Sequence, residues 1–126
     1  CFAPSQFIST GTWTGNTNDD GPFIPTVNSL GVPISPIWIL FKRSSTGTNN
    51  WQIIDRSINP YNAAKYSLPP NETDAQTDWG SPPALDFVTG GIKVRVNNTT
   101  INNGTVIYMA IGTPIIDTDG RIIAGR

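Results

Sequence analysis

Pro36-Ile37-Trp38-Ile39-Leu40-Phe41-Lys42-Arg43 and, after a loop, Trp51-Gln52-Ile53-Ile54-Asp55-Arg56 are the two stretches that decide the fold. Both are rich in β-branched and aromatic residues, and residues 44–50 between them are the Ser, Thr, Gly and Asn typical of a turn. We therefore predict two adjacent antiparallel strands that form the core hairpin. Side chains alternate along a strand, so Ile39 and Phe41 share one face and Trp38 and Leu40 the other. Both faces are apolar, which predicts a first strand covered on both sides near its start.

The composition outside the hairpin favours strands over helices. The chain has 126 residues, enough for one domain with its own core. Eleven prolines and twelve glycines are spread along it, and they leave almost no uninterrupted window for a helix. Only 13% of residues are charged, so Thr, Asn and Ser supply most of the polar surface. We predict an all-β protein.

Charge and residue types exclude several functions. The net charge of −1 with scattered basic residues argues against nucleic acid as a partner. No apolar stretch approaches the roughly 18 residues of a membrane span, so no membrane insertion is expected. Without histidine, a His-based metal site or a Ser-His-Asp triad cannot form, and the single cysteine cannot form an internal disulfide. We expect no cofactor and no metal. The sequence starts at Cys1 rather than methionine, which indicates a fragment or a processed chain.

Further strands are predicted on both sides of the hairpin. Pro25, Pro33 and Pro36 punctuate a connection that is not expected within the middle of a sheet. The predicted strands cover residues 6–14, 86–88, 92–97 and the apolar run 105–111, which fits a central strand covered on both faces. Residues 115–123 read as a hairpin that turns at Asp-Gly. The fold class is therefore a single-domain antiparallel β-sandwich, jelly-roll-like, over residues 1–112, with residues 113–126 as a C-terminal hairpin arm.

The long excursion over residues 59–85 is the predicted binding surface. It is rich in Pro and Asn, contains three aromatic residues and offers at most one helical turn, at residues 63–66. Loops of this length in compact domains are usually functional. The candidate ligand-binding residues are its aromatic and acidic side chains: Tyr61, Tyr66, Asp74, Asp78 and Trp79. Trp13 is a further candidate for stacking on a sugar face, whereas Trp38 and Trp51 are expected in the core.

The acidic residues also suggest a glycosidase acid pair and a calcium site, and both patterns have simpler explanations. Asp74, Asp78 and Asp86 near Trp79 are residue types that a glycosidase uses as an acid pair, but we favour solvated loop carboxylates beside a packing tryptophan. Asp117-Thr118-Asp119-Gly120 and Asp19-Asp20-Gly21 each resemble the start of a calcium loop. Both lack the later bidentate glutamate, and we favour turns. No catalytic residue is therefore assigned.

An ordered set of segments resembles a module of bacteriophage virion proteins. The segments are Gly11-Thr12-Trp13-Thr14-Gly15-Asn16, Asp20-Gly21-Pro22-Phe23-Ile24, Trp38-Ile39-Leu40-Phe41-Lys42-Arg43, Trp51-Gln52-Ile53-Ile54-Asp55, Asn59-Pro60-Tyr61-Asn62, Pro70-Asn71, Asp74-Ala75, Asp86-Phe87, Gly91-Ile92-Lys93-Val94-Arg95 and Asn102-Asn103-Gly104-Thr105-Val106-Ile107-Tyr108-Met109-Ala110. They cover most of residues 10–111. The inserted stretch 77–85 and the extension 113–126 depart from the pattern.

The resemblance implies a non-enzymatic, concanavalin-like sandwich module of a tail fibre or other appendage. Its expected location is the virion, assembled in the bacterial cytoplasm. Its expected partners are other virion proteins, further copies of itself with a homotrimer favoured, and a host-surface polysaccharide. A capsid decoration protein that stabilises the phage head is the alternative, and a polysaccharide-degrading enzyme is a third. The resemblance supplies no catalytic residues.

Overall fold

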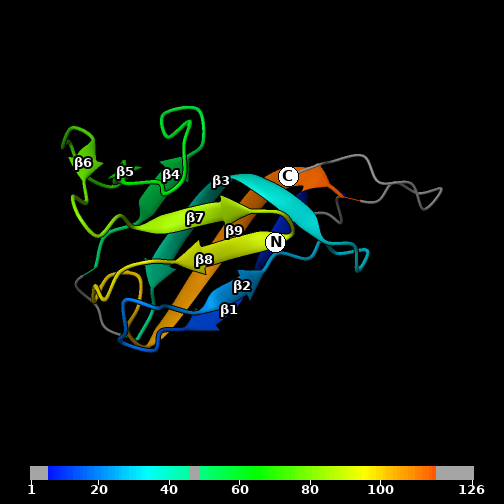
Figure 1. Cartoon of the computed structure of the whole chain (residues 1–126), viewed down its shortest axis with the longest axis horizontal. Coiled ribbons are helices and arrows are strands. Elements are labelled where there is room, and N and C mark those ends of the chain that lie inside the picture. Colours follow the sequence, from blue (N-terminus) through cyan, green and yellow to red (C-terminus); the bar gives the residue numbers. More distant parts are fainter. Residues whose placement is uncertain (1–5, 46–48, 116–126) are drawn as a thin grey trace.

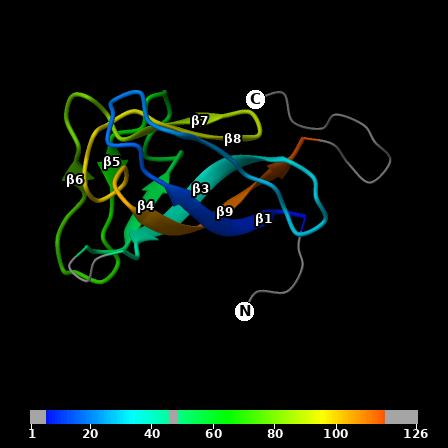
Figure 2. The same ribbon diagram turned by 90° about the horizontal axis from the view of Figure 1, so that it is seen from below.

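The computed structural model describes residues 6–45 and 49–115, and within them it is an antiparallel β-sandwich. The larger sheet has the strand order β1-β9-β3-β4, and the smaller sheet has the order β2-β8-β7. The two sheets lie one above the other when the molecule is seen edge-on (Figure 2). No helix is assigned in the described residues, and so none there is long and apolar enough to cross a membrane. The prediction of an all-β antiparallel sandwich is confirmed.

In the described part of the chain, nine strands make up three sheets, all with antiparallel pairing (Figure 1). The strands are β1 (Ile8–Thr14), β2 (Phe23–Pro25), β3 (Ile34–Arg43), β4 (Gln52–Asp55), β5 (Tyr66–Ser67), β6 (Thr77–Asp78), β7 (Leu85–Val88), β8 (Gly91–Val94) and β9 (Thr105–Pro114). The pair β5-β6 forms a small third sheet at one end of the sandwich.

The predicted core hairpin is present as β3 and β4. Trp38 lies opposite Asp55 and Phe41 opposite Gln52. The predicted boundary at Pro36 is wrong, because β3 begins at Ile34 and includes this proline. Proline has no backbone N–H to donate to a neighbouring strand. It is tolerated at position 36 because the pairing of β3 with β4 begins only at Trp38, so no β4 residue lies opposite Pro36. The register also shifts between Pro36 and Trp38, which leaves the extra residue Ile37 exposed.

The core contains a different tryptophan from the two expected. Trp13 is only 6% exposed, and its ring centroid lies 5.8 Å from that of Phe41 and 5.6 Å from that of Tyr108. Its indole Nε1 donates to the Ile101 carbonyl at 2.9 Å, so the polar end of the buried ring is satisfied. Trp38 and Trp51 are only partly buried. The proposal that Trp13 stacks on a sugar is therefore wrong, as is the core assignment of the other two.

Strand β9 is central, as predicted, but it is covered on one face only. It pairs with β1 over residues 105–111 and with β3 over residues 106–114. Val106, Tyr108 and Ala110 face the sandwich interior and are buried, whereas Ile107 and Met109 alternate with them and are only partly buried. The prediction of cover on both faces is therefore wrong for β9. In β3 the first three residues, 34–36, are buried, whereas Trp38 and Leu40 further along are only partly buried.

The smaller sheet follows its predicted alternation. Ile92, Val94 and Val96 point into the core, while Arg95 and Asn97 are exposed. On the outer side, Arg95 Nε donates to Oδ2 of Asp86 in β7 at 2.6 Å, and the two side chains form an ion pair. The regular strand ends at Val94, earlier than the predicted residue 97.

The single helical turn that the sequence allows at residues 63–66 is not formed, because backbone pairing holds this segment extended. Ala64 bridges Leu85 and Leu68 bridges Ile53, while Tyr66 lies in β5. The start of the predicted hairpin arm also belongs to the larger sheet, because Thr113 and Pro114 pair with Ser35 and Ile34 of β3. The remainder of the predicted hairpin 115–123, from residue 116 onward, lies outside the described residues.

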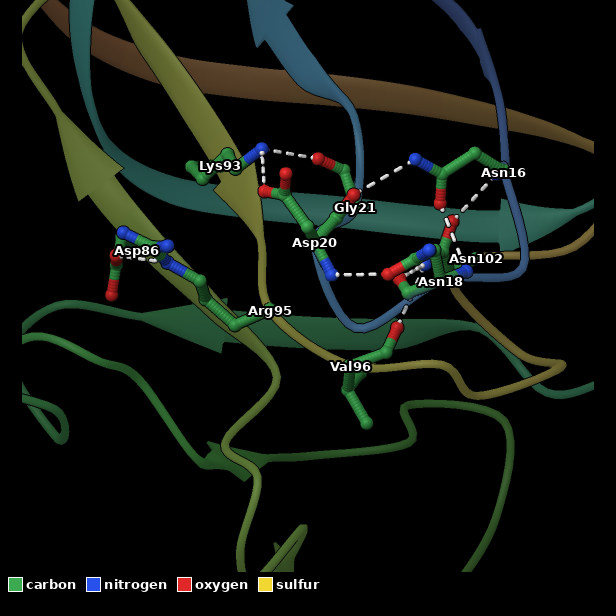
Figure 3. Close-up of polar contacts among 9 residues, drawn as sticks. All are labelled: Asn16, Asn18, Asp20, Gly21, Asp86, Lys93, Arg95, Val96 and Asn102. Atoms are coloured by element: carbon green, nitrogen blue, oxygen red, sulfur yellow. Dashed lines mark hydrogen bonds and ion pairs between the residues drawn. The ribbon is translucent and has the colours of Figure 1, made fainter.

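A buried amide, Asn102, fastens three segments at the end of the sandwich (Figure 3). Its side chain has no exposed surface. Oδ1 accepts from the backbone N–H of Asn16 at 2.8 Å, and Nδ2 donates to the carbonyls of Asn18 and Val96 at 2.6 and 2.9 Å. Gly15 lies so close that an added Cβ would sit 2.1 Å from the Asn102 backbone. One side chain thus joins the loop after β1 to the loop after β8.

The neighbouring loop that resembles a calcium site is organised by side-chain turns and a lysine. Asn16 and Asn18 each accept from the N–H two residues ahead. Asp20 contacts the Lys93 ammonium at 2.7 Å, and Lys93 also donates to the Gly21 carbonyl. Within residues 6–45 and 49–115, no three Cys, Asp or Glu side chains gather as metal ligands. These side-chain turns and the Lys93 contacts therefore account for the conformation of the loop at Asp19-Asp20-Gly21. The second calcium-like stretch, 117–120, lies outside the described residues.

Removing the Asn102 amide should destabilise the fold. We expect Asn102→Ala to lower the free energy of unfolding by about 2–3 kcal/mol, because it leaves buried backbone groups without partners. Urea denaturation followed by tryptophan fluorescence measures the change. The adjacent, partly buried Asn103→Ala is the matched control and should change stability by less than about 0.5 kcal/mol. Equal effects of the two substitutions would contradict this role for Asn102.

Candidate functional site

The small sheet β5-β6 brings together three of the five predicted ligand-binding residues. Tyr66 of β5 lies opposite Asp78 of β6, and Ser67 lies opposite Thr77. Trp79 follows directly, and its backbone N–H donates to the Lys65 carbonyl at 2.9 Å. Tyr66 and Asp78 therefore lie in one short sheet with Trp79 directly after it, although 13 residues separate Tyr66 from Trp79 in the sequence.

A cleft of about 300 Å³ opens beside this sheet. Three separate segments line it: β4, the β6 segment, and the turn that precedes Asn102. The lining residues are Gln52, Thr77, Asp78, Trp79, Asn98 and Thr100. An indole ring, two amides, two hydroxyl groups and one carboxylate thus surround a space open to solvent.

A relay of hydrogen bonds holds the tryptophan and one amide of the cleft in place. The Trp79 indole Nε1 donates to Ser67 Oγ at 2.8 Å, and Ser67 Oγ donates to Gln52 Oε1 at 2.8 Å. Ser67 is fully buried, and Trp79 packs partly against the core. Because Gln52 uses its oxygen in this relay, its Nε2 amide is the donor that the side chain can present to the cleft. The ring and the amide donor are therefore preorganised.

The turn at residues 98–101 supplies the opposite wall. Asn98 Oδ1 accepts from the Thr100 N–H at 2.8 Å, and the Asn98 carbonyl accepts from Asn102 N–H at 2.8 Å. This local turn leaves the Asn98 Nδ2 donor and the Thr100 hydroxyl to face the cleft. The buried Asn102 amide fixes the end of the turn, so the cleft wall depends on the same anchor as the loop after β1.

Asp78 is held by a backbone turn and a lysine at the rim of the cleft. Its Oδ1 accepts from the Gly80 N–H at 2.8 Å, and its Oδ2 lies 3.2 Å from Lys65 Nζ. Gly80 has a φ of 75°, a conformation that favours glycine. The Gly80 hydrogen bond, and then Lys65, lower the pKa of Asp78 below its ordinary value of 3.8. Asp78 is therefore an ionised hydrogen-bond acceptor at neutral pH.

The other predicted site residues lie outside this cleft. Tyr61 is 82% exposed, and none of Tyr61, Tyr66 and the exposed Asp74 is among the lining residues. Asp86, the third carboxylate considered for an acid pair, is buried in its ion pair with Arg95. The three carboxylates thus occupy three different surroundings.

Four lining residues were not predicted from the sequence. The sequence pattern places Gln52 only in the core hairpin, and Asn98 and Thr100 only in a turn. Thr77 was part of the long excursion but was not selected. The sequence hints at Asn98 and Thr100 only through the Asn/Thr-rich composition of residues 97–100. That composition indicates a binding role only once the structure places the turn opposite Trp79.

The described elements define an antiparallel β-sandwich domain with an amide- and tryptophan-lined cleft at one end. The chain belongs to the family described as "Domain of unknown function (DUF7483)", whose sequence profile matches residues 1–113. No curated protein and no solved structure matches the chain significantly.

The geometry at Asp78 predicts how it titrates. Because its pKa is lower in the folded chain, ionised Asp78 stabilises the turn above pH 3.8, and this contribution is lost as the pH falls through the lower folded-state value. In Lys65→Met we expect the pKa of Asp78 to rise but to stay below 3.8, since the Gly80 hydrogen bond is the larger cause. NMR titration of the carboxyl carbon measures both values. If Asp78 of the unsubstituted protein titrates with a midpoint at or above pH 3.8, the turn geometry that joins Asp78 to Gly80 is refuted.

Proposed function

We propose that this domain is a non-enzymatic carbohydrate-binding module of a bacteriophage virion appendage, and that the Trp79 cleft binds a glycan of the host surface. The observation that carries the proposal is the arrangement of the cleft itself. An indole ring stands beside amide, hydroxyl and carboxylate groups whose orientations are fixed by bonds to the fold.

The chemistry of the cleft matches that of a sugar. One face of a pyranose ring is apolar and packs on an aromatic ring, while its hydroxyl groups need both donors and acceptors. The amides of Gln52 and Asn98 supply donors, and Asp78 supplies an acceptor. Because Asp78 is paired with Lys65, the cleft carries little net charge, which favours a neutral saccharide.

The size and openness of the cleft favour a short saccharide unit. Its volume of about 300 Å³ is at the lower end of the range for small-molecule sites. The virion context rests on a different observation, the order of segments over residues 10–111 that resembles phage appendage modules. The two observations are independent, and each can fail without the other.

Glycan binding is tested with an array of bacterial surface polysaccharides and neutral oligosaccharides, followed by titration of any positive glycan in solution. We expect Trp79→Ala to weaken binding at least about tenfold, equal to about 1.4 kcal/mol, because the stacking surface is removed. Thr77→Arg, at an exposed position of the lining, should block the cleft without disturbing the core.

Tyr61→Ala is the matched control, because it removes an exposed aromatic ring outside the cleft and should leave binding unchanged. Binding that survives both Trp79→Ala and Thr77→Arg would contradict the cleft, as would the absence of any bound glycan. The virion context is tested separately by cryo-electron microscopy of purified virions of the encoding phage. Density on the tail or fibres is expected, whereas density on the icosahedral shell would favour capsid decoration instead.

A further inference from the structure

The outer face of the larger sheet is apolar, and no other described element covers it. Ile39, Phe41, Tyr108 and Ala110 are buried on the inner side, so their neighbours along β3 and β9 point outward. In the edge-on view, β1, β9, β3 and β4 form one layer (Figure 2). The smaller sheet lies against the inner face of this layer, and the other face points outward. We call this surface the outer sheet face.

Register defines the residues of the outer sheet face. They are Ile8, Thr10 and Thr12 of β1, Ile107, Met109 and Ile111 of β9, Trp38, Leu40 and Lys42 of β3, and Ile53 and Asp55 of β4. All the apolar members are partly buried by their neighbours and none is fully buried. The exposed bulge residue Ile37, 44% exposed, extends the surface at one end.

The opposite surface of the sandwich shows what a solvated face of this protein looks like. The outer side of the smaller sheet carries Lys93 and Arg95, ion-paired with Asp20 and Asp86. A sheet with one wet face alternates in this way. The outer sheet face instead repeats large aliphatic and aromatic residues across its central strands, and contiguous apolar patches on soluble proteins mark interaction sites.

The charges on the outer sheet face favour a second copy of the same chain. Lys42 and Asp55 are its one cation and its one carboxylate, and they lie on opposite sides of the Leu40–Ile53 pair. A two-fold axis parallel to the sheet through this pair places Lys42 of each copy against Asp55 of the other. The surface is then complementary to itself, as a symmetric dimer requires.

The area of the face indicates how strongly such copies would associate. Strands about 4.8 Å apart, with about seven residues each in β1, β9 and β3 and four residues in β4, cover about 400 Å², or about 800 Å² counted on both copies. Stable complexes bury about 1,200–2,000 Å², so the isolated domain should form a weak, concentration-dependent dimer. Copies held together in a larger assembly would associate more completely.

We propose that the outer sheet face is the contact surface of a two-fold symmetric dimer of this domain. Gln52 lies opposite Phe41 of the inner face, so the Trp79 cleft opens away from the outer sheet face. Both clefts of a dimer therefore stay accessible. The proposal does not depend on glycan binding by the cleft.

Sedimentation velocity of the full 126-residue chain across a range of concentrations tests the dimer. We expect the dimer fraction to rise with concentration, and Met109→Lys to weaken dimerisation more than about 100-fold, because an unpaired charge would be buried at the contact. Met109 is only partly buried, so the lysine can reach water in the monomer, and thermal denaturation confirms that the variant is folded. Phe23→Lys is the matched control, because Phe23 is 52% exposed on the smaller sheet.

Charge reversal tests the position of the axis. Lys42→Asp or Asp55→Lys alone should weaken the dimer about tenfold, and the two together should restore most of the affinity because each new pair is again opposite in charge. A chain that stays monomeric at all concentrations, or dimerises equally well with Met109→Lys, would overturn the proposed surface. A trimer, or a double reversal that fails to restore binding, would overturn the two-fold arrangement.

Discussion

The fold depends on the satisfaction of a small number of buried polar groups, and the Asn102 amide is the central one. With no exposed surface, it bonds to backbone groups of Asn16, Asn18 and Val96. In the preceding residue, the Ile101 carbonyl accepts from the buried indole of Trp13. These bonds tie the polar end of the sandwich to its aromatic core. They also fix the turn that presents Asn98 and Thr100, so stability and the geometry of the cleft share one anchor.

The sequence predicted the strands because alternation is a local property. The pairing of β3 with β4 and the inward side of β8 follow from period-two patterns within a few residues of each other. The choice of core tryptophan could not be predicted in this way. Trp13 lies in the Thr-rich strand β1 and Trp38 in the apolar strand β3, and which ring is enclosed depends on which side of the larger sheet the second sheet occupies. The start of β3 near Pro36 could not be predicted for a similar reason. Whether a β4 residue lies opposite Pro36 depends on the length of β4, which is set by tertiary structure.

The site was predicted where its residues are close in the sequence. Asp78 and Trp79 lie in the long excursion that was singled out, and Tyr66 pairs beside them. Gln52, Asn98 and Thr100 come from segments that meet Trp79 only in three dimensions. Their residue types are common in an Asn- and Thr-rich chain and carry no signal alone. The relay from Trp79 through Ser67 to Gln52 is likewise a tertiary feature.

The central position of β9 has a consequence for how the chain reaches this structure. β1 and β3 do not pair with each other and are joined only through β9, whose partners in β1 lie about a hundred residues earlier. The larger sheet therefore cannot close on the ribosome until residues 105–114 have emerged, and until then β1 lacks its neighbour. Contacts so distant along the chain slow folding, typically to milliseconds or seconds. During synthesis, β1 and the apolar strand β3 therefore expose unpaired edges until β9 emerges, and exposed strand edges of this kind are prone to aggregate.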